Sequence, residues 1–357
     1  MKRVSHIVLA SLAALTLVAS GCSWFKSSSG PKASREDIAM MPRDAGFVMM
    51  VNVSRLRGTP TWKRITDLRD DPASKPRYDE FVKKTGLDPM NQVESVFLAF
   101  PTNAQQTGEF GGVIRGGPFD EAKLVGWAKE EATKAGSEVS SIDVNGKKVY
   151  RDRDGQTFVA FLDTKTVVVG GKEWIKKILD LVGKEGESAA KNDALTGLVK
   201  KTKTGDAFWL AGVVPDDVRA RFKDDPRLTS ASTMKDVYGS IDVKNGFTMT
   251  STVDLAGPAE AKELAARVND QLVDAKKSPQ VQMLGMSTFI DAVKVTSDAG
   301  GAFHLDLSLT QPQVDDLVNR VQGLLKTMGG ALGGGGGGGF PGGAQPMPEL
   351  PPPPANP

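Results

Sequence analysis

Three side chains near the end of the chain, His304, Asp306 and Ser308, have the chemical types of a serine hydrolase triad. They alternate with apolar residues in the segment FHLDLSL, and this period of two predicts a strand with the three polar side chains on one face. At about 3.3 Å per residue, Ser308 would lie about 13 Å from His304, which is too far for nucleophilic catalysis. The spacing therefore predicts a polar strand face and not a catalytic triad.

The sequence has few residues that could bind a metal or carry out redox chemistry. The chain contains one cysteine and two histidines, which excludes a multi-cysteine zinc site, an iron-sulfur cluster and a cluster of imidazoles. Adjacent aspartates point apart on a helix and lack the alternating spacing of a calcium loop. They occur at Asp216-Asp217, Asp224-Asp225 and Asp315-Asp316. We therefore expect no metal and no other cofactor.

Paired glycines precede a predicted helix at Gly111-Gly112 and Gly116-Gly117, and glycine-rich turns before a helix can bind phosphate. The segment lacks the GxxxxGK[ST] pattern, and Pro118 removes one backbone amide. No acidic residue is placed on a following strand as a dinucleotide site requires. We therefore expect a tight turn from strand to helix and no bound nucleotide.

The single cysteine, Cys22, lies directly after a segment with the features of an export signal. Two basic residues are followed by an uncharged apolar run over 7–18, which is shorter than the roughly 20 residues that span a bilayer. Small residues then lead to the cysteine in Ala19-Ser20-Gly21-Cys22, and this segment resembles the lipobox of bacterial lipoproteins. The resemblance implies that residues 1–21 are a signal peptide and that Cys22 carries a thioether-linked diacylglycerol, which would anchor the protein in a membrane.

The resemblance also implies a location in the cell envelope, facing the periplasm. Ser23 stands where lipoproteins of the inner membrane often have Asp, so the outer membrane is favoured over the inner membrane. Cleavage would remove Lys2 and Arg3 and lower the 45 basic residues to 43, equal to the 43 acidic ones. Because a chain without net charge has no basic field, nucleic acid is not expected as a partner.

Both ends of the mature chain have the composition of linkers. Residues 22–38 are rich in Ser and Lys, which predicts a lipidated tether between membrane and folded body. Residues 329–357 contain runs of glycine and proline, which predicts a flexible tail that buries little apolar surface. The folded body is therefore expected over 39–328.

The body divides into two halves with a similar order of predicted elements, 39–204 and 205–328. Each begins with an apolar strand, FVMMVNV or FWLAGVV, continues with two further strands and reaches a Gly-Pro pair before a helix. Gly117-Pro118 matches Gly257-Pro258 in this respect, and proline fits the first position of a helix. A hairpin and a last helix close each half. This order predicts an α+β fold of two related ferredoxin-like units, whose antiparallel sheets are covered by helices.

Four segments of the first half form a further pattern. They are Gly112-Val113-Ile114-Arg115-Gly116, Phe119-Asp120, Gly146-Lys147-Lys148-Val149-Tyr150 and Val167-Val168-Val169-Gly170. With them, most of residues 44–204 resembles a family of exported bacterial proteins known only as a domain of unknown function. The second half lacks the Arg-Gly-Gly and tyrosine-bearing segments. Because the family has no known activity, the resemblance implies none.

A candidate docking face comes from the alternating strand that begins at Phe247. Thr248, Thr250 and Thr252 are predicted on one side of it, and His304 and Asp306 lie on a nearby strand. A polar sheet face of this kind either stays in water or receives a partner, because small hydroxyl groups permit close approach.

These observations favour a non-catalytic envelope lipoprotein that acts as a binding or scaffolding module, held at the membrane by Cys22 and partnered by an envelope protein. The alternative is a hydrolase that acts on envelope material with carboxylate chemistry. It requires two acids to converge in a cleft between the halves, which a sequence does not show.

Overall fold

The computed structural model describes residues 31–320, apart from 73, 152–154, 183, 185, 221, 224–228 and 284. The predicted signal peptide, Cys22 and the tail over 329–357 therefore lie outside the described residues. The chain divides into two compact units, Met1–Val314 and Asp315–Pro357, and the architecture below belongs to the first. Within the described ranges, no helix has the length and apolar character needed to cross a membrane.

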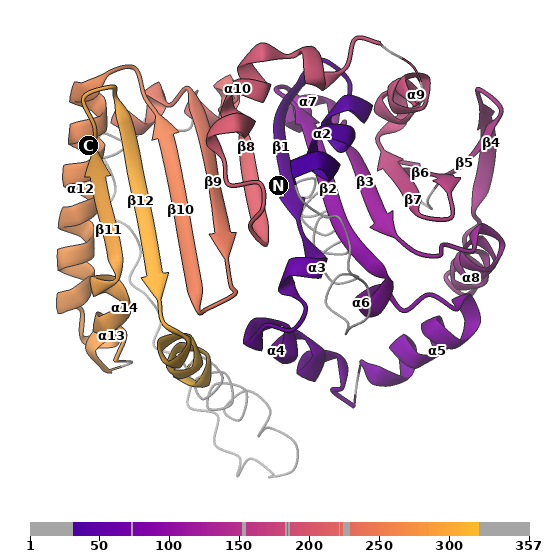
Figure 1. Cartoon of the computed structure of the whole chain (residues 1–357), viewed down its shortest axis with the longest axis horizontal. Coiled ribbons are helices and arrows are strands. Elements are labelled where there is room, and N and C mark those ends of the chain that lie inside the picture. The colour runs from indigo at the N-terminus through magenta and orange to yellow at the C-terminus, as the bar shows by residue number, and fades with distance from the viewer. Residues whose placement is uncertain are drawn as a thin grey trace, which may run out of the picture. The chain divides into compact units, whose positions relative to one another are not determined.

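One antiparallel sheet of twelve strands runs through this unit, in the order β11-β12-β10-β9-β8-β1-β2-β3-β7-β6-β5-β4 (Figure 1). The first half contributes β1 (Ala45–Val51), β2 (Val93–Pro101), β3 (Gly111–Gly116), β4 (Ser140–Val144), β5 (Lys147–Arg151), β6 (Phe158–Asp163) and β7 (Thr166–Gly170). The second contributes β8 (Phe208–Val213), β9 (Asp236–Asp242), β10 (Phe247–Asp254), β11 (Val293–Ser297) and β12 (Ala302–Leu309). The predicted α+β class with antiparallel strands is confirmed, and the two halves share one sheet.

The halves have the same strand order on either side of their junction, where β1 pairs with β8. Outward from it, β1-β2-β3-β7-β6 matches β8-β9-β10-β12-β11, and the β4-β5 hairpin is an addition to the first half. This strand order differs from that of the predicted ferredoxin-like units. In such a unit the strands that a helix connects are separated by another strand, whereas here the first three strands of each half are direct neighbours. Periodicity identified the strands, but their partners depend on long-range contacts.

Helices pack against the sheet in both halves. In the first half they are α2 (Pro31–Met40), α3 (Val53–Leu56), α4 (Pro60–Arg69), α5 (Lys75–Thr85), α6 (Pro89–Gln92), α7 (Ala104–Thr107), α8 (Glu121–Lys134), α9 (Lys172–Leu181), η1 (Ala189–Lys191) and α10 (Asp193–Lys201). The second half has α11 (Asp216–Ala220), η2 (Ser230–Thr233), α12 (Pro258–Lys277), α13 (Pro279–Met283) and α14 (Ser287–Asp291). Residues 311–314 of this unit and 315–320 of the second unit are also helical.

The two matched helices begin differently. Pro258 is the first residue of α12, as predicted. In the first half the helix begins three residues after Pro118, at Glu121, because Asp120 is the N-cap and accepts a hydrogen bond from the Lys123 N–H.

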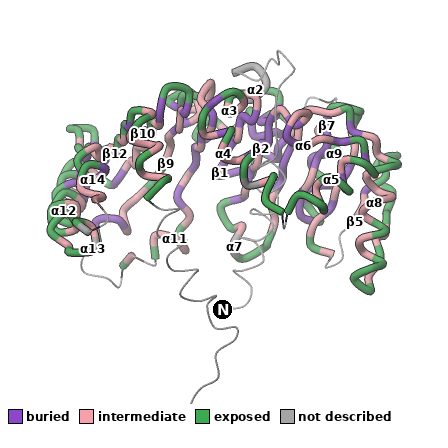
Figure 2. The backbone as a smooth tube through the Cα atoms, turned by 90° about the horizontal axis from the view of Figure 1, so that it is seen from below, coloured by how far each residue is buried: buried purple, intermediate pink, exposed green. Residues whose placement is uncertain are grey.

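In the first half, helices cover both faces of the sheet. Val48 and Met50 belong to a buried cluster with side chains of α2, α9 and α10, and we call this side face A. The opposite side, face B, carries Val51 and is packed by α3, α4 and α6 in one cluster and by α5 and α8 in another. Buried residues therefore lie along strands such as β2, whereas the outer turns of α8 and α12 are exposed (Figure 2).

The predicted tether over 22–38 ends in ordered structure, because its last eight residues are part of α2. Asp37 and Ile38 of this helix are buried, and Arg115 of β3 donates from Nε to Asp37 Oδ1 at 2.7 Å. Burial raises the pKa of Asp37 to about 6, although the Arg115 guanidinium acts in the opposite direction. Composition alone indicated a linker, since the cation that holds Asp37 lies far along the chain.

The junction between the halves depends on a glycine. Gly212 of β8 stands opposite Phe47 of β1, and a Cβ at this position would lie 2.6 Å from the Phe47 Cα and 2.7 Å from the Gly46 carbonyl oxygen. We expect Gly212→Ala to lower the free energy of unfolding by about 2 kcal/mol, because backbone atoms in a packed sheet have no room to move. Chemical denaturation measures this change. Gly126→Ala in α8, where a Cβ meets nothing within 4 Å, is the control and should be neutral or stabilising; equal loss in both variants would contradict the explanation.

Candidate functional site

The strands β9 to β12 carry polar side chains on face A. Thr248, Thr250 and Thr252 of β10 are in register with Ser308, Asp306 and His304 of β12, so the predicted docking residues share one side of the sheet. We call this surface the polar face. Its members are Asp236, Tyr238, Ser240, Asp242, Thr248, Thr250, Thr252, Asp254, Lys294, Thr296, His304, Asp306 and Ser308.

The apolar side chains of the same strands point to face B. Leu255, Val295 and Phe303 are buried there with Leu264 and Ala265 of α12. α12 packs along β11 and β12, as Figure 1 shows. On the polar face, by contrast, Thr248, Asp306 and Ser308 are exposed. In the second half, α10 covers face A at β8 and contacts β9, whereas exposed polar side chains lie on this face of β10 to β12. The first half is covered by helices on both faces.

Hydrogen bonds hold the outer part of the polar face in place. His304 Nδ1 lies 3.1 Å from Thr252 Oγ1, and its Nε2 lies 3.2 Å from Asp298 Oδ2. Asp298 in turn accepts backbone N–H groups of Gly300 and Ala302. The Ala302 N–H, followed by His304, holds the pKa of Asp298 below its usual range. Both nitrogens of His304 are thus within hydrogen-bond distance of side chains that orient the strand end.

The inner part of the polar face borders α10. Lys201 of α10 lies 3.2 Å from Asp254 Oδ2 and 5.1 Å from the centre of the Tyr238 ring. Asp236 stands opposite Asp254 in the register, and burial, with the charge of Asp254, raises the pKa of Asp236. Lys201, Tyr238 and Asp236 were not expected at this face from the sequence, because their proximity to Asp254 depends on the pairing of β9 with β10 and on the packing of α10.

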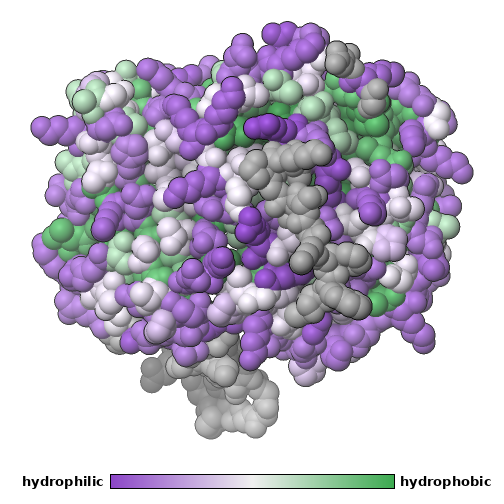
Figure 3. Space-filling view, in the orientation of Figure 1, coloured by the Kyte–Doolittle hydropathy of each residue, from purple (hydrophilic) through white to green (hydrophobic). Residues whose placement is uncertain are grey.

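The polar face carries more negative than positive charge. Its strand positions include the four aspartates Asp236, Asp242, Asp254 and Asp306 against one lysine, Lys294, which is in register with Asp306. Lys201 offsets Asp254 from the border. The remaining surface consists of small hydroxyl side chains, so the polar face is acidic and has few long side chains. Figure 3 shows that hydrophilic residues dominate the side of the molecule turned to the viewer, with hydrophobic residues in smaller groups.

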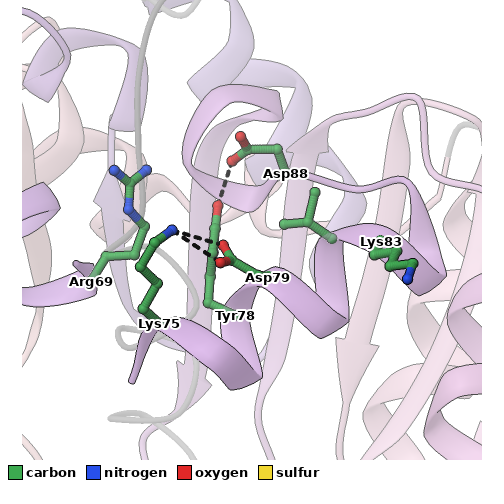
Figure 4. Close-up of a pocket in the computed structure, with 7 residues that line it drawn as sticks. Arg69, Lys75, Tyr78, Asp79, Lys83 and Asp88 are labelled. Atoms are coloured by element: carbon green, nitrogen blue, oxygen red, sulfur yellow. Dashed lines mark hydrogen bonds and ion pairs between the residues drawn. The ribbon is translucent and has the colours of Figure 1, made fainter. Parts of the chain in front are cut away.

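A separate hollow of about 360 Å³ lies in the first half, between α4, α5 and the start of α6. Figure 4 shows two pairs of polar groups directed at each other: Tyr78 donates to Asp88 Oδ1 at 2.5 Å, and Lys75 pairs with Asp79 at 3.0 Å. Burial and the adjacent Asp88 raise the pKa of Tyr78. Asp88 also caps α6. The two acids of this hollow are therefore engaged in local structure, and nothing in it favours the hydrolase alternative, which stays a prediction.

Metal binding was not expected from the sequence. Within the ranges that the structure describes, no group of three or more His, Cys, Asp or Glu side chains is placed to hold a metal ion. Cys22, the predicted lipidation site, lies outside these ranges.

Comparisons with known proteins give a limited picture. No protein-family model matches the sequence, and no curated protein matches it. The resemblances to lipoprotein signals and to an exported family therefore stay predictions. Among solved structures, crystal form IV of TP0453 is similar with a TM-score of 0.42 and 13% identity, over 80% of this chain and 98% of that one. Crystal form I of the same protein gives a TM-score of 0.40 and 13% identity, over 81% and 97%. Similarity at this level assigns no activity, ligand or partner.

Proposed function

We propose that this chain is a non-catalytic lipoprotein of the cell envelope and that its polar face binds another envelope protein. The observation that carries the proposal is the open polar face of β9 to β12, in a sheet whose other half is covered by helices on both faces. A sheet face is a rigid surface, and its hydrogen-bonded side chains lose little further entropy when a partner binds. The polar face is therefore a preorganised surface of the kind that can receive another protein.

The charge of the polar face indicates the chemistry of its partner. Four aspartates and one lysine lie on its strands, so a partner with a basic surface is complementary to it. The hydroxyl groups of Thr248, Ser308 and Thr296 are exposed and short, and they permit a flat surface to approach the backbone closely. We infer a protein partner with Lys or Arg side chains at the contact.

The anchor is the second part of the proposal. Cys22, acylated in the manner of bacterial lipoproteins, would hold the chain at a membrane facing the periplasm, and Ser23 favours the outer membrane. Only eight residues, 23–30, separate Cys22 from α2, so the folded body would remain close to the bilayer. The partner is therefore sought among envelope proteins.

Charge reversal on the polar face tests the binding function. Thr248 and Asp306 are exposed, so Thr248→Arg with Asp306→Arg should fold normally while placing two cations on an acidic surface. We expect the wild type to copurify a defined basic partner from membranes and the double variant to lose at least about tenfold in affinity for it, as judged by titration of the purified pair. Thr248→Ser with Asp306→Asn is the matched control and should retain the partner. An unchanged affinity in the arginine variant, with unchanged melting temperature, would remove the polar face from consideration.

A further inference from the structure

The two ends of the twelve-stranded sheet differ in how their edges are protected. At one end, β11 carries the exposed Lys294, and Asn269 of α12 donates from Nδ2 to the Val295 carbonyl oxygen at 3.4 Å. Charged residues and a covering helix are the usual means by which proteins prevent edge strands from pairing with other chains. At the other end, β4 carries no lysine, and its one charged side chain, Asp143, accepts a hydrogen bond from the Gly146 N–H of the hairpin turn. The central residue of β4, Ile142, is 43% exposed and is one of two large hydrophobic side chains exposed in the described part of the chain.

The β4 edge is held rigidly by the body. β4 pairs with β5 along all five residues, from Ser140 with Arg151 to Val144 with Lys147. On face B, the Tyr150 hydroxyl of β5 donates to Glu121 Oε1 of α8 at 2.7 Å. At the hairpin turn, the Asn145 side chain donates to Asp180 of α9. The outer backbone groups of β4 are therefore fixed in a strand conformation, and among the described residues β5 is its only strand neighbour.

The hairpin has no counterpart in the second half. There the strand that matches β6 is β11, and it forms the protected edge. The strand order that the halves share is therefore complete without β4 and β5. Their addition gives the first half an edge strand whose central side chain, Ile142, is apolar and exposed.

We propose that β4 is a self-association edge, at which a second copy of this chain adds its own β4 in antiparallel orientation. The sequence SSIDV suits a two-fold register centred on Ile142. In this register Ile142 faces its own copy, Ser141 faces Asp143 and Ser140 faces Val144, so two apolar side chains meet and no like charges stand opposite each other. The arrangement is isologous and closes as a dimer, because each copy has one such edge.

A contact of one five-residue strand is smaller than a standard protein interface, so the association is expected to be weak in dilute solution. A covalent trap detects a weak association because the linked species accumulates. Opposed residues in antiparallel strands have Cα atoms about 4.5 to 5.5 Å apart, a separation that a disulfide bridges readily.

Ile142→Cys in the full chain, isolated in its membranes and mildly oxidised, is the test. We expect a disulfide-linked species of twice the mass that disappears on reduction. Ser140→Cys is the control, because residue 140 lies on the same face of the same strand. In the proposed register the two residues 140 of the dimer are offset by four residues, about 13 Å, so this variant should give several-fold less disulfide-linked dimer. When chains with Ser140→Cys are mixed with chains with Val144→Cys, a disulfide should form between position 140 of one chain and position 144 of the other. This mixed dimer would confirm the register.

Two outcomes overturn the proposal. One is an equal yield of dimer from Ile142→Cys, Ser140→Cys and Thr296→Cys on the protected β11 edge, which would indicate random collision. The other is an Ile142→Cys adduct with a different protein, identified by mass spectrometry, which would make the edge a site for a foreign strand. The proposal concerns the first half only and does not depend on the polar face of the second.

Discussion

Replacing Arg115 with methionine is expected to lower the free energy of unfolding by about 3 kcal/mol at neutral pH, because it leaves the buried Asp37 carboxylate without its cation. The side chain of Asp37 is fully buried, and its Oδ2 atom has no donor among the described residues. Denaturant unfolding of the wild type and the variant measures the difference. The loss of unfolding free energy should be smaller at pH 5. At this pH Asp37 is largely protonated in the folded wild type, so the Arg115 guanidinium stabilises it less.

The sign of the pH dependence follows from the raised pKa of Asp37. The folded state has a pKa of about 6 where the ordinary value is 3.8, so between these values the folded chain holds a proton that the unfolded chain has released. The contribution of Asp37 to stability is therefore greatest below pH 3.8 and falls by roughly 3 kcal/mol as the pH rises through 6, at about 1.4 kcal/mol per pKa unit.

Asp37→Asn isolates this contribution, because it retains the size of the side chain and removes its titration. The stability of the wild type minus that of the variant should fall as the pH rises from 4 to 6.5. Other carboxylates titrate in both proteins and cancel in the difference. A difference that stays constant over this range would show that Asp37 has an ordinary pKa and that α2 is not held by a buried ionisable pair.

Cys22→Ala is expected to abolish lipid attachment altogether, since the acyl chains attached there would provide the membrane affinity. The measurement is incorporation of radiolabelled palmitate, together with fractionation of membranes from soluble protein. The variant should carry no label and should accumulate as an uncleaved or soluble chain.

Ser23→Ala, next to the cysteine, is the control for the lipidation test. It should incorporate palmitate as the wild type does, because the thiol is retained. Failure of the wild type itself to take up label would contradict the lipoprotein assignment, while leaving the folded body and its polar face as described.

The alternation in the second half could be predicted from the sequence because it is local. Thr248, Thr250 and Thr252 share a face in any extended strand, and His304 and Asp306 were predicted on a nearby strand. That they lie directly opposite the threonines comes from the pairing of β10 with β12. The acidic character of the whole face was not predicted, because Asp236 and Asp242 belong to this face only through the register of β9 with β10. Local periodicity fixes which side a residue faces but not which strand lies beside it.

The same distinction explains the errors in the fold. The strands and the related order of the halves were visible as periodic segments, whereas the ferredoxin-like order required knowledge of strand partners. α2 was missed because Ser and Lys near its start indicated a linker, while the contacts that order it come from Arg115 and the cluster around Ile38. A local signal did exist, since Asp37, Ile38 and Met41 have the spacing of a helix face that packs against a core.

The binding function of the polar face is tested most directly by photo-crosslinking in living cells. A photoreactive amino acid at Thr248, which is exposed beside Asp242 on the acidic surface, is compared with the same group at Lys262, which is exposed on α12 at the opposite face. We predict a discrete adduct from position 248 only, with its crosslinked peptide rich in Lys or Arg, and its loss when Asp306→Arg is added. Absence of any adduct at position 248, or the same adducts from both positions, would contradict the proposal that this face receives a protein partner.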